Sequence, residues 1–329
     1  MPQFQRIYRI VCVLVFLALY ASAAESSVEQ KAIYTARTTT SFHLREAPNS
    51  TRRIANVPKS VRVEVLVYDE EWSYLRYQGK TGYAQTSWLR EFISLDPVHN
   101  PLPGHTPCTG IWTVNRRLTV ETDEFPGAVL TKNMVVSVRK EAESFLLPVW
   151  RSSTVLPSSS GTYTAFVPWE TAESGDLIAG FTTFYAKTDG EPLAKERQKN
   201  IALACELISQ VNLAPGDTFS FNRVCGPYSA KKGYLPANII GSTGTGTGGG
   251  VCQVSTTLYN AVLELPLRIT DWTVHTVKGV KYVPIAFDAC VGTYSDMCFE
   301  NTLPFPIRLE AFPQDGALTV LLWHGGTLN

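Results

Sequence analysis

A cysteine at position 252 follows three glycines and a valine and stands at the start of a helical pattern. Apolar residues recur behind it at helical spacing: Val254, Leu258, Ala261, Val262 and Leu265. The first turn of a helix has unpaired backbone N–H groups and carries the positive end of the helix dipole. Both favour a thiolate over a thiol. Cys252 is therefore our candidate nucleophile.

Two further residues follow Cys252 in an order that acyl-transfer chemistry uses. His275 and then Asp288 would supply a base and a carboxylate, the order found in thiol proteases and transglutaminase-like enzymes. The stretch between them is interrupted by Gly279 and Pro284, which predicts a hairpin that brings the carboxylate to the imidazole. In this arrangement His275 holds Cys252 as thiolate, and Asp288 fixes the ring tautomer.

Residues close to Cys252 complete the predicted site. Gly249 and Gly250 would border a bound ligand, and the backbone N–H of Cys252 would donate to an oxyanion. Gln253 or Ser255 would supply a second donor, and the sequence does not choose between them.

The predicted triad has a structural alternative at each position. A cysteine on a helix is often a packing or disulfide residue, a histidine in a strand is often structural, and an aspartate often caps a turn. The order of Cys252, His275 and Asp288 favours the catalytic interpretation over these three separate explanations.

The composition is that of an ordinary globular protein of about two domains. The chain has 329 residues, of which 44% are hydrophobic and 18% charged, with a formal net charge of zero. Nothing in this charge balance indicates nucleic-acid binding.

The N-terminus has the three parts of a secretory signal peptide. Arg6 and Arg9 precede an apolar run over residues 10–20, and Ala21-Ser22-Ala23 follows it. We predict cleavage after Ala23 and no stable membrane span thereafter, because the run is short for a transmembrane helix. An uncleaved anchor is the alternative.

Export would place the remaining chain where disulfides form. It keeps six cysteines: Cys108, Cys205, Cys225, Cys252, Cys290 and Cys298. We predict a disulfide between Cys290 and Cys298, which are close in sequence. Cys205 lies on the apolar face of a predicted helix and is expected to be buried. If Cys252 is a free nucleophile, at least one other cysteine must be unpaired.

The N-terminal half is predicted to be rich in strands. Residues 32–92 alternate short Val-, Tyr- and Trp-rich runs with turns, which predicts a small all-β barrel. Residues 95–107 are proline-rich and indicate a linker, and residues 111–167 add further strands. His99 and His105 lie in the linker without partners at metal-ligand spacing.

The C-terminal unit mixes helix and strand. We predict a strand over 181–185, a helix over 193–211, a strand-like segment over 217–222 and several strands between 268 and 323. The glycine-rich run 241–250 lacks the Gly-Lys-Ser/Thr ending of a phosphate-binding loop, so we interpret it as a flexible approach to the Cys252 helix.

The barrel segment resembles bacterial SH3-like (SH3b) domains over about sixty residues. The resemblance rests on blocks in the expected order: Leu44-Arg45, Val61 to Leu66, Glu71 to Leu75, Gly79 to Ala84 and Trp88-Leu89. It implies binding to cell-wall peptides or glycan. A surplus of ten basic over six acidic residues between Lys31 and Glu91 suits an anionic wall. Alternatively, Trp72 and Trp88 are core residues and the charges a solvated face.

The C-terminal unit resembles the VanW family over about 145 residues. The resemblance rests on these blocks: Phe181-Thr182-Thr183, Asn200-Ile201, Pro215 to Asn222, Gly226-Pro227, Gly233-Tyr234, Gly248 to Ala261, Tyr282-Val283-Pro284, Asp288-Ala289 and Phe299-Glu300-Asn301. The Gly-Gly-Gly-Val-Cys-Gln-Val-Ser-Thr-Thr-Leu-Tyr-Asn-Ala block is the most specific of them. The resemblance implies an exported, cell-envelope role in bacteria and supplies no reaction.

Together these observations predict an α+β protein. We expect a signal peptide over 1–23, an SH3-like barrel over 32–92, a β-rich connecting region over 95–179 and a VanW-like α+β domain over 180–325, with a thiol protease or transglutaminase-like architecture. The expected function is peptidoglycan binding with Cys-dependent acyl transfer or amide hydrolysis on wall peptides. The alternative is a non-catalytic wall-binding or scaffold protein. We expect no cofactor and no metal; a metal protein inside the cell would require a second set of ligands.

Overall fold

The structure is a computed structural model that describes residues 30–122, 125–185, 193–240, 244–275 and 279–325. The predicted signal peptide and its cleavage point lie outside the described residues. The regular structure is mostly β-strand with few helices, as the strand-rich pattern predicted. Among the described residues, no helix has the length and apolar character needed to cross a membrane.

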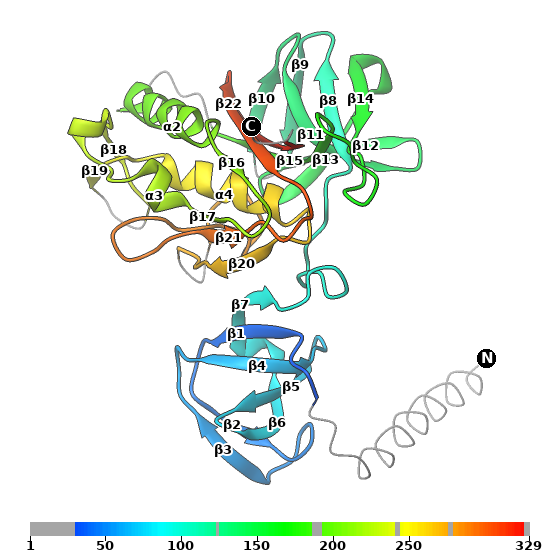
Figure 1. The fold of residues 1–329 in the computed structure, drawn as a ribbon, viewed down its shortest axis with the longest axis vertical. Coiled ribbons are helices and arrows are strands. Elements are labelled where there is room, and N and C mark those ends of the chain that lie inside the picture. Colours follow the sequence, from blue (N-terminus) through cyan, green and yellow to red (C-terminus); the bar gives the residue numbers. More distant parts are fainter. Residues whose placement is uncertain (1–29, 123–124, 186–192, 241–243, 276–278, 326–329) are drawn as a thin grey trace. The chain divides into compact units, whose positions relative to one another are not determined.

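Seven antiparallel strands form one sheet in the N-terminal segment (Figure 1). They are β1 (Tyr34–Thr38), β2 (Phe42–Arg45), β3 (Arg53–Val57), β4 (Arg62–Val67), β5 (Trp72–Tyr77), β6 (Lys80–Gln85) and β7 (Leu89–Ser94), with the short helix η2 (Thr86–Trp88) before β7. Their order is β3-β2-β6-β5-β4-β1-β7. Buried and less buried residues alternate along β1 and β2, because successive side chains point to opposite faces of a sheet. The kinship with SH3-like domains stays a prediction.

A second β-rich unit occupies much of the region predicted to connect the two ends. It contains β8 (Gly110–Val114), β9 (Leu118–Thr122), β10 (Phe125–Leu130), β11 (Val135–Glu141), β12 (Ser144–Val149), β13 (Ser152–Leu156), η3 (Ser158–Ser160) and β14 (Gly161–Ala165). Five strands follow the order β13-β12-β11-β8-β14, and β9 pairs with β10. Trp112 and Leu147 are fully buried in its core, so this region has a packed interior of its own.

The C-terminal domain sets helices against small antiparallel sheets (Figure 1). Its elements are β15 (Leu177–Phe184), α2 (Ala194–Ile208), β16 (Asn212–Leu213), β17 (Thr218–Ser220), α3 (Phe221–Cys225), η4 (Ala230–Lys232), β18 (Pro236–Asn238), β19 (Thr245–Thr247), α4 (Val251–Val262), β20 (Arg268–Asp271), β21 (Cys298–Glu300), β22 (Ile307–Gln314) and β23 (Ala317–His324). The strand orders are β15-β23-β22-β16, β17-β21-β20 and β18-β19. Helix α4 packs against β15 and β23, and α2 against β22.

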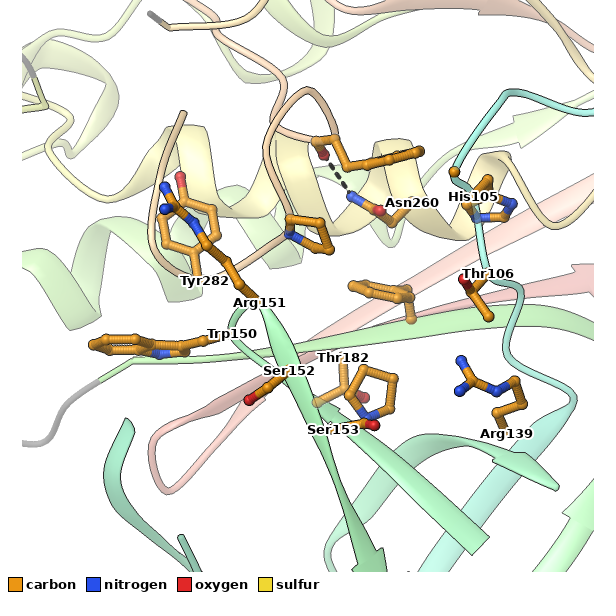
Figure 2. A pocket seen from close by; sticks show the side chains of 15 residues that line it. His105, Thr106, Arg139, Trp150, Arg151, Ser152, Ser153, Thr182, Asn260 and Tyr282 are labelled. Atoms are coloured by element: carbon orange, nitrogen blue, oxygen red, sulfur yellow. Dashed lines mark hydrogen bonds between the residues drawn. The ribbon is translucent and has the colours of Figure 1, made fainter. Parts of the chain in front are cut away.

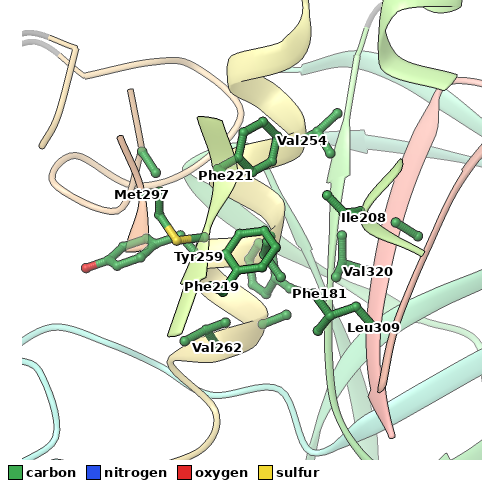
Figure 3. Packing of buried hydrophobic residues seen from close by; sticks show 14 of the residues in the cluster. Phe181, Ile208, Phe219, Phe221, Val254, Tyr259, Val262, Met297, Leu309 and Val320 are labelled. Carbon is green, nitrogen blue, oxygen red and sulfur yellow. The ribbon is translucent and has the colours of Figure 1, made fainter. Parts of the chain in front are cut away.

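Helix α4 lies at the centre of the domain core. Figure 3 shows its residues Val254, Tyr259 and Val262 among side chains from the sheets and from α2 and β17. The Tyr259 ring stacks on Trp272, with centroids 4.9 Å apart. The structure describes all of α4, and every residue of this helix is buried except Cys252. The helix thus presents one partly accessible group, the candidate thiol.

Local hydrogen bonds shorten two predicted elements. The helix predicted over 193–211 ends at Ile208. The hydroxyl of the next residue, Ser209, donates to the Cys205 carbonyl and so satisfies an acceptor at the end of the helix. The strand predicted over 217–222 is wrong at its end, because Ser220 Oγ accepts from Arg223 N at 3.1 Å and starts α3 at Phe221.

Two other predictions about the site's framework are wrong. The described residues between His275 and Asp288 form no strand, so the predicted hairpin is replaced by an irregular loop. The described part of the glycine-rich run is ordered structure: Thr245–Thr247 forms β19, paired with β18. A Cβ added to Gly249 would lie 2.6 Å from the Asn238 carbonyl oxygen, so this position needs glycine for close approach of two backbones.

We therefore expect Gly249→Ala to lower the free energy of unfolding by about 1–3 kcal/mol, because backbone rather than a flexible side chain blocks the new methyl group. Chemical denaturation measures this difference. Gly292→Ala is the matched control, since a Cβ there meets nothing within 4 Å. Equal stability of the two variants would show that the contact at Gly249 is not constraining.

Candidate active site

The start of α4 positions Cys252 through the glycines before it. Gly250 occupies the N-cap position with a φ of 105°, a conformation that side chains rarely adopt. A Cβ at this position would also lie 2.8 Å from Arg197 Cγ. Cys252 consequently lies in the first turn of a twelve-residue helix, where the helix dipole favours negative charge.

His275 and Asp288 form a close pair beside this turn. The Asp288 carboxylate accepts from His275 Nδ1 at 2.6 Å and from the His275 backbone N–H at 2.9 Å. The side chain of His275 is 6% exposed and that of Asp288 is fully buried. The pair fixes the ring so that Nε2 is free for other chemistry; among the described residues this buried nitrogen has no hydrogen-bond partner.

A second thiol joins the cluster. The sulfurs of Cys252 and Cys290 and a ring nitrogen of His275 all lie within 4.8 Å of one another. Cys252, His275 and Asp288 are therefore brought together as the sequence order required, and Cys290 is a site residue that the sequence analysis missed.

The predicted Cys290–Cys298 disulfide is wrong: both residues are free thiols in the structure. Cys298 Sγ instead donates to the Asp296 carboxylate at 3.3 Å. A usable signal was present in the sequence. Asp288 and Cys290 are two residues apart, and in an extended segment such residues point to the same side.

Helix α4 holds the segment that carries Asp288 and Cys290. Ser255 Oγ donates to the Ala289 carbonyl at 2.7 Å, and Ala289 N donates to Thr256 Oγ1 at 2.9 Å. One turn further on, Asn260 Nδ2 donates to the Phe287 carbonyl at 2.8 Å. The same helix thus places both thiols of the cluster.

The other side of this segment is held by the chain around His275. Trp272 Nε1 donates to the Asp288 carbonyl at 3.0 Å, and Cys290 N donates to the Thr273 carbonyl at 2.9 Å. These bonds keep His275 and Cys290 at a fixed separation without a regular strand pairing.

The two thiols share one proton unequally. A hydrogen bond from Cys252, together with the nearby His275, lowers the pKa of Cys290 to about 5 although burial opposes this. The hydrogen bond to Cys290 and burial raise the pKa of Cys252 well above its ordinary value. Cys252 therefore keeps its proton near neutral pH, and its thiol donates to the Val291 carbonyl oxygen at 3.3 Å. The prediction that His275 holds Cys252 as a thiolate is wrong, because Cys290 and burial outweigh the helix dipole.

Burial lowers the pKa of His275, but its hydrogen bond to Asp288 and the nearby Cys290 outweigh burial and raise that pKa to about 9. These pKa values favour a Cys290 thiolate and a His275 imidazolium next to a protonated Cys252 at neutral pH. A thiolate that exists near pH 7 is the reactive form of cysteine for acyl transfer and for metal binding.

The four residues predicted to border a ligand have clear structural partners. The Gly249 carbonyl accepts a hydrogen bond from the Asn200 side chain, and Gly250 is the N-cap residue of α4. Gln253 Oε1 accepts from Arg197 at 2.6 Å and Gln253 Nε2 donates to Thr183 at 3.0 Å. The bonds of Ser255 go to Ala289 and to the Cys252 carbonyl. Their predicted ligand-binding role remains a prediction.

Two cavities share Tyr282 as a lining residue. One cavity of about 240 Å³ is lined by Tyr282 and Asn260 on the helix side and by Trp150 and Arg151 on the β side (Figure 2). A second, of about 160 Å³, is lined by Tyr282 and by Gln253. The pKa of the Tyr282 hydroxyl is raised, mainly by burial and next by the charge on the Cys252 sulfur. Tyr282 thus lines both cavities and lies near enough to Cys252 to feel its charge.

A thiol, an imidazole and a buried carboxylate at the start of a core helix define a thiol–imidazole site. The family described as "VanW like protein" matches residues 196–323, a range that contains all four residues of the cluster. Residues 196–323 therefore form a VanW-like domain, in agreement with the resemblance predicted from the sequence.

Two curated relatives are similar over parts of this range. The "Uncharacterized protein YoaR" of Bacillus subtilis (strain 168) is 39% identical over 138 residues, which are 41% of this chain and 45% of that protein. The "Vancomycin B-type resistance protein VanW" of Enterococcus faecalis (strain ATCC 700802 / V583) is 38% identical over 85 residues, 24% of this chain and 30% of that protein. The similarity spans less than half the length of either relative.

The electrostatics of the cluster predict a measurable titration. We expect thiolate absorbance in the ultraviolet to show one cysteine with a pKa of about 5, and NMR to show the His275 ring with a pKa of about 9. In Asp288→Asn the imidazolium loses its carboxylate while burial remains, so the His275 pKa should fall to about 6.5 or lower.

Asp217→Asn is the control for this titration, because Asp217 bonds the Ala214 backbone and belongs to no part of the cluster. It should leave both pKa values unchanged. An unchanged His275 pKa in Asp288→Asn would contradict the assigned role of the carboxylate.

Proposed function

We propose that the VanW-like domain is a cysteine-dependent acyl transferase or amidase that acts on cell-wall peptides. The observation that carries the proposal is the close grouping of Cys252 with the His275–Asp288 pair and the Cys290 sulfur. The name of the Enterococcus faecalis relative refers to vancomycin resistance. We infer from it a cell-envelope role for this chain, with export by the predicted signal peptide.

The protonation of the cluster suggests how attack would begin. Cys252 Sγ forms a bond to the carbonyl carbon of a peptide amide while its proton passes to the Cys290 thiolate. The developing oxyanion is stabilised near the N-terminus of α4. No net charge enters the site during this step, which suits a buried location.

Collapse of the tetrahedral adduct breaks the C–N bond. The His275 imidazolium gives its proton to the leaving amine, and a thioester remains on Cys252. An acceptor amine or water then attacks the thioester with neutral His275 as base. Cys252 leaves as thiolate and recovers its proton from Cys290. Asp288 orients the ring throughout.

The second candidate function is a non-catalytic wall-binding or scaffold protein. The observation that favours it is that Gln253 and Ser255, the predicted oxyanion donors, direct their polar groups to partners within the protein. In this case Cys252 would be dispensable, and wall binding would be the whole function.

Substitution of Cys252 separates the two functions. Wall fragments bearing stem peptides are incubated with the chain, and products and protein are analysed by mass spectrometry. We expect a thioester on the wild type and none on Cys252→Ala, whose turnover should fall to background. Cys290→Ala should be slower by about 100-fold or more, because it removes the proton acceptor.

Cys298→Ser is the matched control, since Cys298 is also a partly buried free thiol but lies outside the cluster. It should keep wild-type turnover. Full turnover in a folded Cys252→Ala variant would refute the proposed nucleophile. No turnover by the wild type, with wall binding unchanged in Cys252→Ser, would support the scaffold.

We also propose that residues 32–92 bind the wall polymer. The basic surplus of this segment and its partly exposed aromatic rings support the proposal: Trp72 and Trp88 lie with centroids 6.5 Å apart in an edge-to-face arrangement. Aromatic rings of this kind pack against sugar or peptide while basic groups attract an anionic polymer.

In a sedimentation assay with purified cell walls, we expect Trp72→Ala in the whole chain to weaken binding several-fold, because it removes a large contact surface. Tyr294→Ala is the control; Tyr294 is 99% exposed in the C-terminal domain. Equal losses in the two variants would show that the segment 32–92 makes no specific contribution.

A further inference from the structure

The cluster at the start of α4 contains one more soft ligand than acyl transfer requires. A cysteine nucleophile needs one thiol and a base, and a hydroxyl or a water can serve as its proton acceptor. Here two sulfurs, from Cys252 and Cys290, converge with a ring nitrogen of His275 within 4.8 Å. Two thiols and an imidazole are the donor set that thiophilic metals prefer.

The spacing of these atoms is close to that of a metal site. In tetrahedral zinc sites the Zn–S and Zn–N distances of about 2.3 and 2.0 Å place ligand atoms roughly 3.5 Å apart. The three donor atoms lie within 4.8 Å of one another without an ion. A contraction of about 1 Å, within the range of side-chain rotation, closes them around a common centre.

The histidine is already oriented as a metal ligand. Its Nδ1 is bonded to the Asp288 carboxylate at 2.6 Å, the arrangement that fixes the tautomer of metal-binding histidines. Its Nε2 is buried and has no hydrogen-bond partner within the described part of the chain. Only 6% of the His275 side chain is exposed, so bulk water does not readily reach Nε2 and supply the missing hydrogen bond.

We propose that Cys252, His275 and Cys290 bind one Zn²⁺ ion, with Asp288 orienting the imidazole and the fourth position left to water or substrate. The ligands come from two segments that α4 already holds together through Ser255 and Thr256, so little ordering accompanies binding. Binding displaces two protons, the thiol proton of Cys252 and the Nε2 proton of the His275 imidazolium, and both are released to solvent.

The zinc site is independent of the acyl-transfer proposal and competes with it. A metal on Cys252 Sγ occupies the electron pair that would attack a carbonyl carbon. Zinc should therefore inhibit any Cys252-dependent turnover, and a chelator should restore it. Metal binding itself is measured without substrate, so either proposal can fail while the other stands.

The test uses the whole chain, reduced and freed of metal, with Zn²⁺ titrated against a chromophoric chelator. We expect one ion per chain and protection of both cluster thiols from an alkylating reagent. Co²⁺ in place of Zn²⁺ should give a thiolate-to-metal charge-transfer band. Cys252→Ser, Cys290→Ser and His275→Ala should each weaken binding by at least about 100-fold, and Asp288→Asn by about 10–100-fold.

Cys298→Ser is the matched control and should bind as the wild type does, because its sulfur is bonded to Asp296 outside the cluster. Circular dichroism checks that each variant is folded. The serine variants keep the size of the side chain, so a loss of binding reports the lost sulfur. Wild-type binding no tighter than that of Cys290→Ser, or a cobalt complex without the charge-transfer band, would overturn the proposal.

Discussion

The hydrogen bonds from α4 to residues 287–289 are the interactions on which the site depends. Ser255, Thr256 and Asn260 contribute side chains to backbone groups of a segment that has no regular secondary structure. Because these groups are buried, leaving one unpaired would cost about 1–3 kcal/mol. The irregular segment is thereby held in one conformation. The helix that carries Cys252 also determines where Asp288 and Cys290 lie, so the spacing of the two thiols is a property of one rigid element.

Burial of Asp288 is the second constraint. A fully buried carboxylate is costly unless it is paired and hydrogen-bonded, and both bonds to its Oδ2 come from His275. This pairing favours the imidazolium. The imidazolium in turn favours a thiolate at Cys290, and the thiolate accepts from Cys252. The charge at one end of the cluster therefore sets the protonation of the other, across four residues that are distributed over thirty-nine positions of the sequence.

Much of this framework was predictable. The helical spacing of apolar residues predicted α4 to within one residue of its start, and the turn-rich alternating runs predicted the strands of the first half. The order of Cys252, His275 and Asp288 predicted their grouping. The role of Cys290 was missed, because its closeness to Cys298 in sequence favoured a disulfide over the signal given by its spacing from Asp288. Ser255 and Gln253 looked like donors to a ligand, since a sequence does not show which buried groups await a partner.

The sequence by itself determined a thiol at the start of a buried helix and the strand-rich character of the chain. Both follow from short-range rules: glycine permits the positive φ at Gly250, and apolar periodicity selects the buried face. Only the tertiary structure decided that a second thiol completes the cluster and that the surroundings lower the pKa of Cys290 and raise that of Cys252. The reason is physical: the pKa of a thiol depends on burial and on the donors and charges around it, and the loop containing Cys290 receives these from distant parts of the chain.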